Sequence, residues 1–329
     1  MKKTILLIIL ACFVSLSFGQ YGKGSPETIE SWKDKTLIVI EYPTSPTYNN
    51  SVKTVVNERW YNDKIEYIKF KNRKGLKKRE DIVILSVKLD VVGSPLICLD
   101  PKMIKKDDYF FSNDKNGSVA IPVQPLYWKN SSDTSWKDDN AITFDTKLMM
   151  EYKKNMYNSN IISALYVLNQ SSSERIKLMI DIIFNTSDQF KTGEYVFTNP
   201  RKHRLTYNKK ADIDLLKGKT LLIEEKCIPT ESSSPKENKE LLDSDYLKSL
   251  YKGNIKVVSE EELMTAIKKQ NENEIYLILN FSGTFNLFSI IDLKDRKIIY
   301  CGMEKAKPGD TNKMQPFKRM LPNIYNHRY

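Results

Sequence analysis

The chain has 329 residues, 40% of them hydrophobic, and a formal net charge of +11. This composition is sufficient for a packed core and excludes a disordered chain, and the length allows one large domain or two of ordinary size. Beyond the first 19 residues only Cys98, Cys227 and Cys301 occur, without a CxxC pair. The sequence therefore excludes a disulfide scaffold and does not support a zinc or redox centre; a single Cys227–Cys301 bridge and three buried thiols both stay open.

Residues 1–19 have the pattern of a secretory signal peptide. Two lysines precede an apolar stretch over residues 4–14, and the small residues Ser17 and Gly19 stand before a cleavage site at Gln20. The apolar stretch is shorter than the about 20 residues that a membrane-spanning helix needs. We therefore predict an exported protein, periplasmic or secreted, with no transmembrane span in the mature chain.

Two further points concern the export prediction. Residues 9–12 resemble a bacterial lipobox, and the alternative is therefore a lipid anchor at Cys12. Removal of the signal peptide takes away two lysines and leaves 50 basic and 41 acidic residues, a net charge of +9. In an exported protein this charge favours an anionic partner such as a lipid headgroup, an acidic glycan or the envelope surface, and not nucleic acid.

The strands and the helix that indicate a first lobe fall within residues 34–100. The apolar run Leu37–Ile40 predicts a strand that is covered on both faces. After a turn-rich loop over 43–50, apolar residues at helical spacing predict a helix over 51–61. Strands are expected at 65–68 and 82–85.

The same order of elements recurs in the second half of the chain. Residues 217–225 contain a similar apolar run, followed by a helical pattern over 239–251 and by strands at 255–258 and 275–279. One interpretation is an internal duplication; the other is a single α/β chain whose buried strands look alike. We predict an α/β or α+β fold with two lobes of mixed sheet and flanking helices, duplicated under the first interpretation.

The middle of the chain combines a hairpin signal with helices. Residues 109–112 and 119–123 flank an Asn-Gly turn, and the segment 144–185 has a helical pattern broken at Ser171–Ser173, where Ser172 or Ser173 is expected to cap the second helix. We interpret this helical segment as a connector between the lobes.

The predicted organisation is a signal peptide at 1–19, an N-terminal lobe at 20–140, a helical connector at 141–190 and a C-terminal lobe at 191–329. In the C-terminal lobe, residues 285–293 and 297–301 are expected to form a hairpin.

The most basic stretch of the chain lies between two predicted strands, at residues 69–79. Its charges predict docking on an anionic surface through Lys74, Lys77, Lys78 and Arg79; the alternative is a solvated connection. The matching place in the second lobe contains Ser259 and Glu262 at the spacing of a capping box.

A second candidate ligand-binding region is the polar loop 128–139. The loop contains Trp128 and Trp136, together with the carboxylates Asp133, Asp138 and Asp139. Exposed aromatic rings beside carboxylates are suited to sugars, whereas the alternative is that both rings anchor the loop to the body of the protein.

Few catalytic chemistries are available to this sequence. It has two histidines, His203 and His327, and no G-x-S-x-G, H-E-x-x-H or P-loop motif. The pattern at 114–117 resembles a calcium-binding loop but lacks the downstream glutamate that such a loop needs, so we assign no metal site. We also assign no cofactor and no catalytic residue. The leading hypothesis is an exported, non-catalytic envelope protein that binds an anionic or glycan ligand or another envelope protein. The alternative is a secreted glycan hydrolase with a carboxylate pair near residues 128–145.

Overall fold

The computed structural model describes residues 26–89, 95–101, 119–122, 146–155, 157, 159–192, 195–197, 205–207, 214–225, 244–282, 285–305, 320–322 and 324. The chain divides into two compact units, residues 1–123 with 134–193 and residues 124–133 with 194–329. Each unit contains a five-stranded mixed sheet with helices. The predicted mixed α/β fold class is therefore confirmed.

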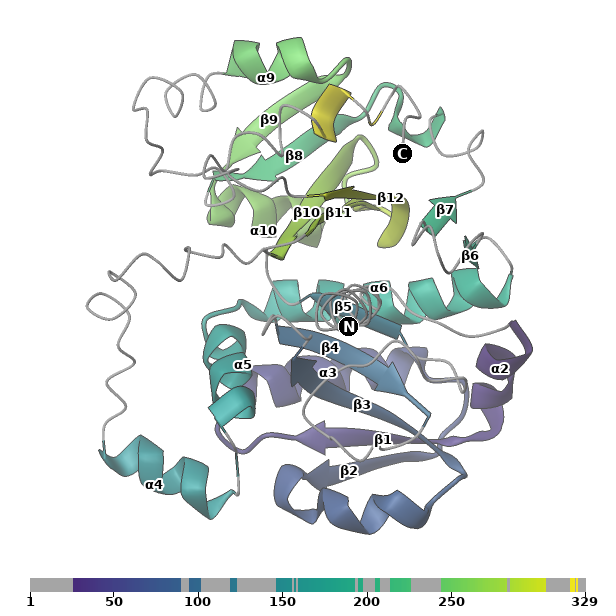
Figure 1. The fold of residues 1–329 in the computed structure, drawn as a ribbon, viewed down its shortest axis with the longest axis vertical. Helices are drawn as coiled ribbons and strands as arrows, with labels where there is room; N and C mark the ends of the chain where they lie inside the picture. The colour runs from purple at the N-terminus through teal and green to yellow at the C-terminus, as the bar shows by residue number, and fades with distance from the viewer. Residues whose placement is uncertain are drawn as a thin grey trace, which may run out of the picture. The chain divides into compact units, whose positions relative to one another are not determined.

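In the sheet of the first unit β3 is the central strand, and β1 lies between β3 and the edge strand β2 (Figure 1). β1 runs parallel to β2 on one side and to β3 on the other, and β4 and β5 extend the sheet in antiparallel fashion beyond β3. The four side chains Leu37–Ile40 are all buried, as expected for a strand covered on both faces. The strands are β1 (Thr36–Glu41), β2 (Ile65–Lys69), β3 (Ile82–Leu89), β4 (Pro95–Asp100) and β5 (Val119–Pro122).

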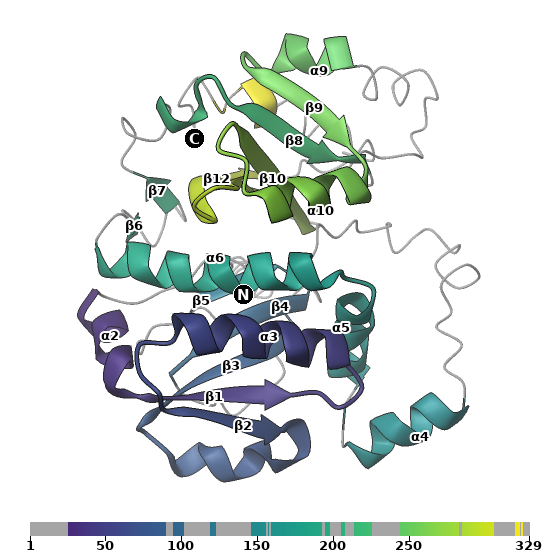
Figure 2. The same ribbon diagram turned by 180° about the vertical axis from the view of Figure 1, so that it is seen from behind.

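The helices α5 and α6 of the first unit pack on this sheet, where both contact β4. α3 lies alongside α6, and α6 also contacts β4 and β5 (Figure 2). α6 comes from the segment that was predicted to be a connector, and its contacts place it on the sheet of the first unit. The helices are α2 (Pro26–Glu30), α3 (Pro46–Arg59), α4 (Thr146–Lys154), α5 (Ser159–Asn169) and α6 (Ser173–Lys191), with the 3₁₀ helices η1 (Ser31–Asp34) and η2 (Phe70–Lys78).

Local signals explain two helix boundaries and correct one prediction. α3 begins at Pro46, inside the stretch expected to be a loop, because proline fits the first turn of a helix, where its missing N–H would have no partner anyway. The predicted cap of α6 is confirmed, since the Ser172 hydroxyl accepts a hydrogen bond from the Arg175 N–H at 3.2 Å. β5 pairs with β4, while the predicted partner strand at 109–112 lies outside the described residues.

The second unit contains a two-stranded sheet and a five-stranded sheet. In the larger sheet β8 is parallel to β9 and β10, and β11 and β12 follow β10 in antiparallel fashion, which confirms the predicted hairpin around Lys294. The elements are β6 (Tyr195–Phe197), β7 (Leu205–Tyr207), β8 (Thr220–Glu224), α9 (Ser244–Leu250), β9 (Asn254–Val258), α10 (Glu260–Lys269), β10 (Glu274–Ser282), β11 (Phe285–Asp292) and β12 (Lys297–Lys305).

The two five-stranded sheets share strand order, strand direction and register. The order β2-β1-β3-β4-β5 corresponds strand for strand to β9-β8-β10-β11-β12. Thr36 stands opposite Ile82 in the first sheet, as Thr220 stands opposite Glu274 in the second. In the other pair of parallel strands, Leu37 stands opposite Ile65, as Leu221 stands opposite Ile255.

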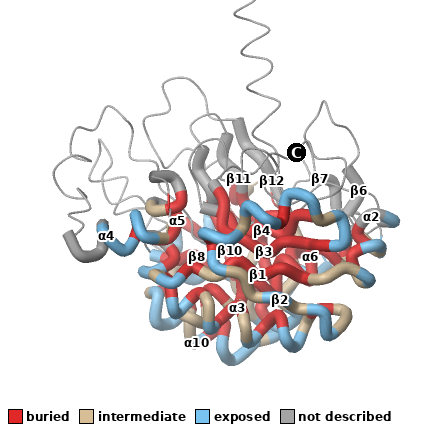
Figure 3. The backbone as a smooth tube through the Cα atoms, turned by 90° about the horizontal axis from the view of Figure 1, so that it is seen from below, coloured by how far each residue is buried: buried red, intermediate tan, exposed pale blue. Residues whose placement is uncertain are grey.

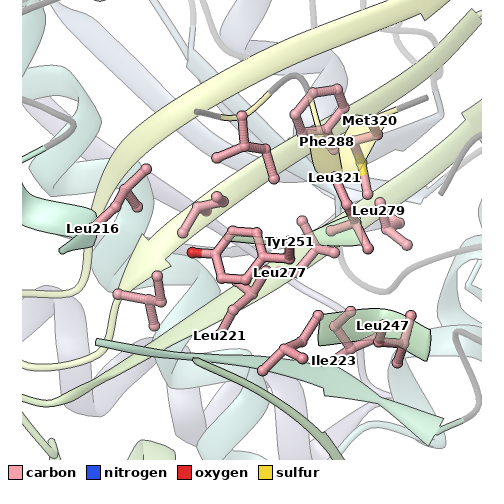
Figure 4. Close-up of a cluster of buried hydrophobic side chains, with 14 of the residues drawn as sticks. Leu216, Leu221, Ile223, Leu247, Tyr251, Leu277, Leu279, Phe288, Met320 and Leu321 are labelled. Carbon is pink, nitrogen blue, oxygen red and sulfur yellow. The ribbon is translucent and has the colours of Figure 1, made fainter. Parts of the chain in front are cut away.

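Each sheet is embedded in apolar side chains. In the first unit β1, β3 and β4 are largely buried (Figure 3). In the second unit one face of the sheet packs against α9 and against the buried side chains Met320, Leu321 and Ile324 (Figure 4). No helix among the described residues combines the length and the apolar character needed to cross a bilayer.

Candidate functional site

The basic run falls on η2, which joins β2 to β3 and is the blue coil beside β2 in Figure 2. Lys74, Lys77 and Lys78 lie on this helix, and Arg79 follows its last residue. Trp128 and Trp136, the other predicted ligand-binding residues, lie outside the described residues, as do the carboxylates of their loop. The candidate site is therefore η2 with its immediate surroundings.

The sequence of η2 repeats with a period of three, which matches the helix that it forms. A 3₁₀ helix has three residues per turn, so side chains at i, i+3 and i+6 lie in one row. The row of Phe70, Arg73 and Leu76 faces the protein: Phe70 and Leu76 are buried, and Arg73 is half-buried. Burial of the two apolar side chains holds η2 against β1 and β2.

The two remaining rows of η2 face solvent. We call one of them the lysine row; it consists of Lys71, Lys74 and Lys77, all exposed. The other row contains Asn72, Gly75 and Lys78, also exposed. Of the four lysines in these rows, Lys74, Lys77 and Lys78 were predicted as site residues. Lys71 was missed, and the period of three was the signal that would have identified it.

Two arginines of the basic stretch are engaged within the protein. Arg79 donates to both carboxylate oxygens of Glu66, at 3.0 and 2.9 Å, and to Asp81, at 3.2 and 2.8 Å. Hydrogen bonds from Asp81 and then Glu66 raise the pKa of Arg79, and the same contact lowers the pKa of Asp81. Arg79 thus ties β2 to the residue before β3, and two carboxylates balance its charge.

Arg73 contributes to packing and not to the solvent-facing charge. Its guanidinium lies 3.5 Å from the centre of the Phe70 ring and donates to the Phe70 carbonyl at 3.2 Å. Such a cation–π contact stabilises a partly buried arginine. The charges that η2 presents to solvent are therefore lysine charges.

These lysine charges are not matched by acidic residues of the helix. η2 contains no aspartate or glutamate, and within the described part of the chain no salt bridge joins Lys71, Lys74 or Lys78 to a carboxylate. Like charges so close together repel one another in the free protein. An anionic partner relieves this repulsion, and the arrangement is therefore suited to binding anions.

The corresponding connection in the second unit shows what the fold itself requires. α10 joins β9 to β10, as η2 joins β2 to β3, but it is an amphipathic α-helix with Leu263, Ala266 and Ile267 buried. Its N-terminus is acidic, and the predicted capping box of Ser259 and Glu262 is confirmed, with hydrogen bonds of 3.2 and 2.9 Å. The same topology therefore folds without a lysine row.

The carboxyl ends of the parallel strands, where α/β sheets commonly bind ligands, are filled in the first unit. The Tyr42 hydroxyl accepts a hydrogen bond from the Val87 N–H at 2.9 Å and donates to the Val87 carbonyl at 3.3 Å. The Tyr42 ring packs against Tyr48, Phe70 and Tyr157 at centroid distances of 5.5, 5.6 and 6.2 Å. Burial, and then the nearby Tyr48, raise the pKa of Tyr42, so its hydroxyl keeps its proton.

Two buried polar pairs lie within the five-stranded sheets. Lys88 on β3 and Asp100 on β4 form an ion pair at 2.6 Å. In the second unit the Tyr276 hydroxyl donates to the buried Glu224 carboxylate at 3.2 Å. In both pairs the charged group is satisfied within a sheet, which is the arrangement of a structural contact.

No group of His, Cys, Asp and Glu side chains in the described residues is arranged to hold a metal ion. Both histidines lie outside those residues, and Cys98 is a buried thiol that forms no disulfide.

No protein-family model matches the chain, and no curated protein or solved structure matches it. The chemistry of η2 is therefore the basis for a functional proposal.

Proposed function

We propose that this protein is an exported, non-catalytic envelope protein that binds an anionic partner through η2. The observation that carries the proposal is the set of four exposed lysines on one short helix, Lys71, Lys74, Lys77 and Lys78, beside no acidic residue of that helix. Export is supported by the signal-peptide pattern of residues 1–19. The positive charge of the mature chain favours an anionic partner outside the cytoplasm.

We also propose that the two units are copies of one ancestral unit. Support comes from the shared strand order, strand directions and register of their five-stranded sheets. Under this proposal η2 and α10 occupy equivalent places. The lysines of η2 are then a specialisation of one copy, since the other copy bridges the same strands with an acidic capping box.

The test is cosedimentation of the purified mature chain, starting at Gln20, with isolated bacterial cell envelopes. The variant replaces Lys71, Lys74, Lys77 and Lys78 with Gln. At about 1 kcal/mol per lysine near an acidic surface, the loss is about 4 kcal/mol, which weakens binding by roughly three orders of magnitude.

A matched control removes the same charge elsewhere. Lys153, Lys154, Lys268 and Lys269 are exposed and lie on α4 and α10. Their replacement by Gln is expected to leave most of the binding intact, because it lowers the net charge by the same amount but leaves the lysines of η2 in place. Equal losses in both variants would show that net charge alone drives association, and retention of binding by the η2 variant would refute the proposal.

A further inference from the structure

We infer that the anionic partner of η2 is a linear acidic polysaccharide that carries a carboxylate on each repeating sugar. This inference rests on the proposed anion binding and specifies its chemistry. It is derived from three features of η2: the charges form a line, the exposed rows contain no apolar or aromatic side chain, and the cations that face solvent are lysines.

The first feature is the linear arrangement of charge. A 3₁₀ helix rises about 2.0 Å per residue, so successive members of the lysine row are about 6 Å apart along a straight line. The neighbouring outward row starts with two uncharged residues, Asn72 and Gly75. A Cβ atom added at Gly75 would meet no other atom within 4 Å, so the surface beside the lysine row is open to a ligand at this position. The lysine charges therefore form a line, which complements a linear chain of anions and not a flat anionic surface.

The second feature separates a polysaccharide from a membrane. Peripheral membrane segments insert apolar side chains between headgroups. The apolar residues of η2, Phe70 and Leu76, are both buried in the inner row. η2 therefore offers charge without an apolar anchor.

The same feature separates a polysaccharide from single-stranded nucleic acid, whose bases stack on exposed aromatic rings. Phe70 is the aromatic residue of η2, and the Arg73 guanidinium covers its ring. No aromatic side chain stands in the exposed rows. A polyanion without bases fits this surface.

The third feature is the choice of cation. Arginine offers a planar fork that recognises phosphate and carboxylate in a fixed bidentate geometry, whereas lysine is a point charge on a flexible stem. Arg79 already makes such a bidentate contact inside the protein, with Asp81 through its Nε and Nη2 atoms. The solvent-facing lysines therefore suit carboxylates repeated along a chain in varying orientation.

Two triple variants of the mature chain distinguish a line of charges from a patch. The row variant is Lys71→Gln, Lys74→Gln and Lys77→Gln. The control variant removes three exposed lysines outside η2, at Lys64, Lys69 and Lys153. Affinity for polygalacturonate, a linear uronate polymer, is measured against salt concentration, with the galacturonate monomer and phosphatidylglycerol vesicles as comparison probes.

The inference predicts a difference in salt dependence. At about 0.7 per contacted charge, three lysines give a slope near −2 in log affinity against log salt, and binding weakens roughly 20-fold between about 50 and 200 mM salt. The row variant is expected to lose this slope, and the control variant to keep it. The monomer should bind far more weakly than the polymer, because it meets one lysine at a time.

The outcomes separate the inference from the proposed function. Equal losses in both triple variants would overturn the linear match. Binding to vesicles without binding to polygalacturonate would overturn the polysaccharide and leave anion binding by η2 intact. Binding to neither probe would overturn both.

A single substitution provides an independent test that removes no lysine. Gly75 is exposed, and its φ angle lies outside the left-handed region, so a side chain fits there without strain or collision. Gly75→Glu places a carboxylate beside the lysine row and is expected to weaken polygalacturonate binding several-fold. Gly75→Gln has the same shape without the charge and should bind like the natural protein; equal behaviour of the two variants would contradict the inference.

Discussion

Replacement of Tyr42 by Phe tests how the first sheet ends. The pairing of β1 with β3 ends at Val39 and Leu85, whereas β3 continues to Leu89, so Val87 has no paired residue in β1. The Tyr42 hydroxyl takes the place of that neighbour, because it bonds to both the N–H and the carbonyl of Val87. Tyr42→Phe keeps the ring and removes both hydrogen bonds.

The expected loss follows from these two groups. A buried donor or acceptor left without a partner costs about 1–3 kcal/mol. The N–H contact, at 2.9 Å, is the stronger of the two, and the carbonyl contact is longer, at 3.3 Å. We therefore expect Tyr42→Phe to lower the free energy of unfolding of the first unit by about 3 kcal/mol.

Tyr48 provides a matched control in the same aromatic cluster. It is also fully buried, but its hydroxyl has no hydrogen-bond partner among the described residues. Tyr48→Phe removes a polar atom that costs free energy to bury, so the free energy of unfolding should stay the same or rise by up to about 1 kcal/mol.

The measurement is urea unfolding of both variants, together with hydrogen exchange of the peptide that contains Val87. Tyr42→Phe should speed exchange of the Val87 amide, whereas Tyr48→Phe should not. If the two variants have equal free energies of unfolding, the hydroxyl of Tyr42 does not serve as the strand neighbour that the structure indicates.

Three further predictions concern other buried or capped groups. Asp100→Asn removes the negative charge beside the buried Lys88 ammonium and should cost about 3 kcal/mol in urea unfolding; an unchanged midpoint would show that the ion pair is not formed. Ser259→Ala removes the cap of α10 and should cost about 1 kcal/mol by thermal unfolding, while Ser249→Ala, in an exposed position on α9, should not. Burial raises the pKa of Tyr42 and Tyr48 above the 10.0 of an unfolded chain. The folded state then keeps protons that the unfolded state releases, so the free energy of unfolding, measured in urea at a series of pH values, should be constant below pH 10 and fall above it.

Elements specified by neighbouring residues were predictable from the sequence. The apolar run of β1 identified a buried strand, and the spacing of Ser259 and Glu262 identified a helix start. The serine cap of α6 was identified in the same way. In each of these cases the stabilising partner lies within a few residues, so a local pattern contains the necessary information.

Elements specified by distant residues were not predictable. Tyr42 and Val87 are 45 residues apart, and no local pattern shows that a tyrosine hydroxyl will end a sheet. Arg79 binds Asp81, two residues away, but its contact with Glu66 on β2 joins residues 13 apart and has no local signature. The basic run itself was visible, but its geometry depended on recognising a period of three in place of the helical period of 3.6.

That period explains how one short helix can serve both stability and binding. In an α-helix, side chains at i, i+3 and i+6 drift by about 60° at each step, so three lysines at this spacing would turn toward the buried side. In η2 they stay in register, and so do the buried Phe70 and Leu76 of the inner row. Lysine-row substitutions should therefore alter anion binding at nearly constant stability, whereas Leu76→Ala should lower stability by about 2 kcal/mol or more. If the lysines of η2 were instead needed for folding, their substitution would lower stability and anion binding together.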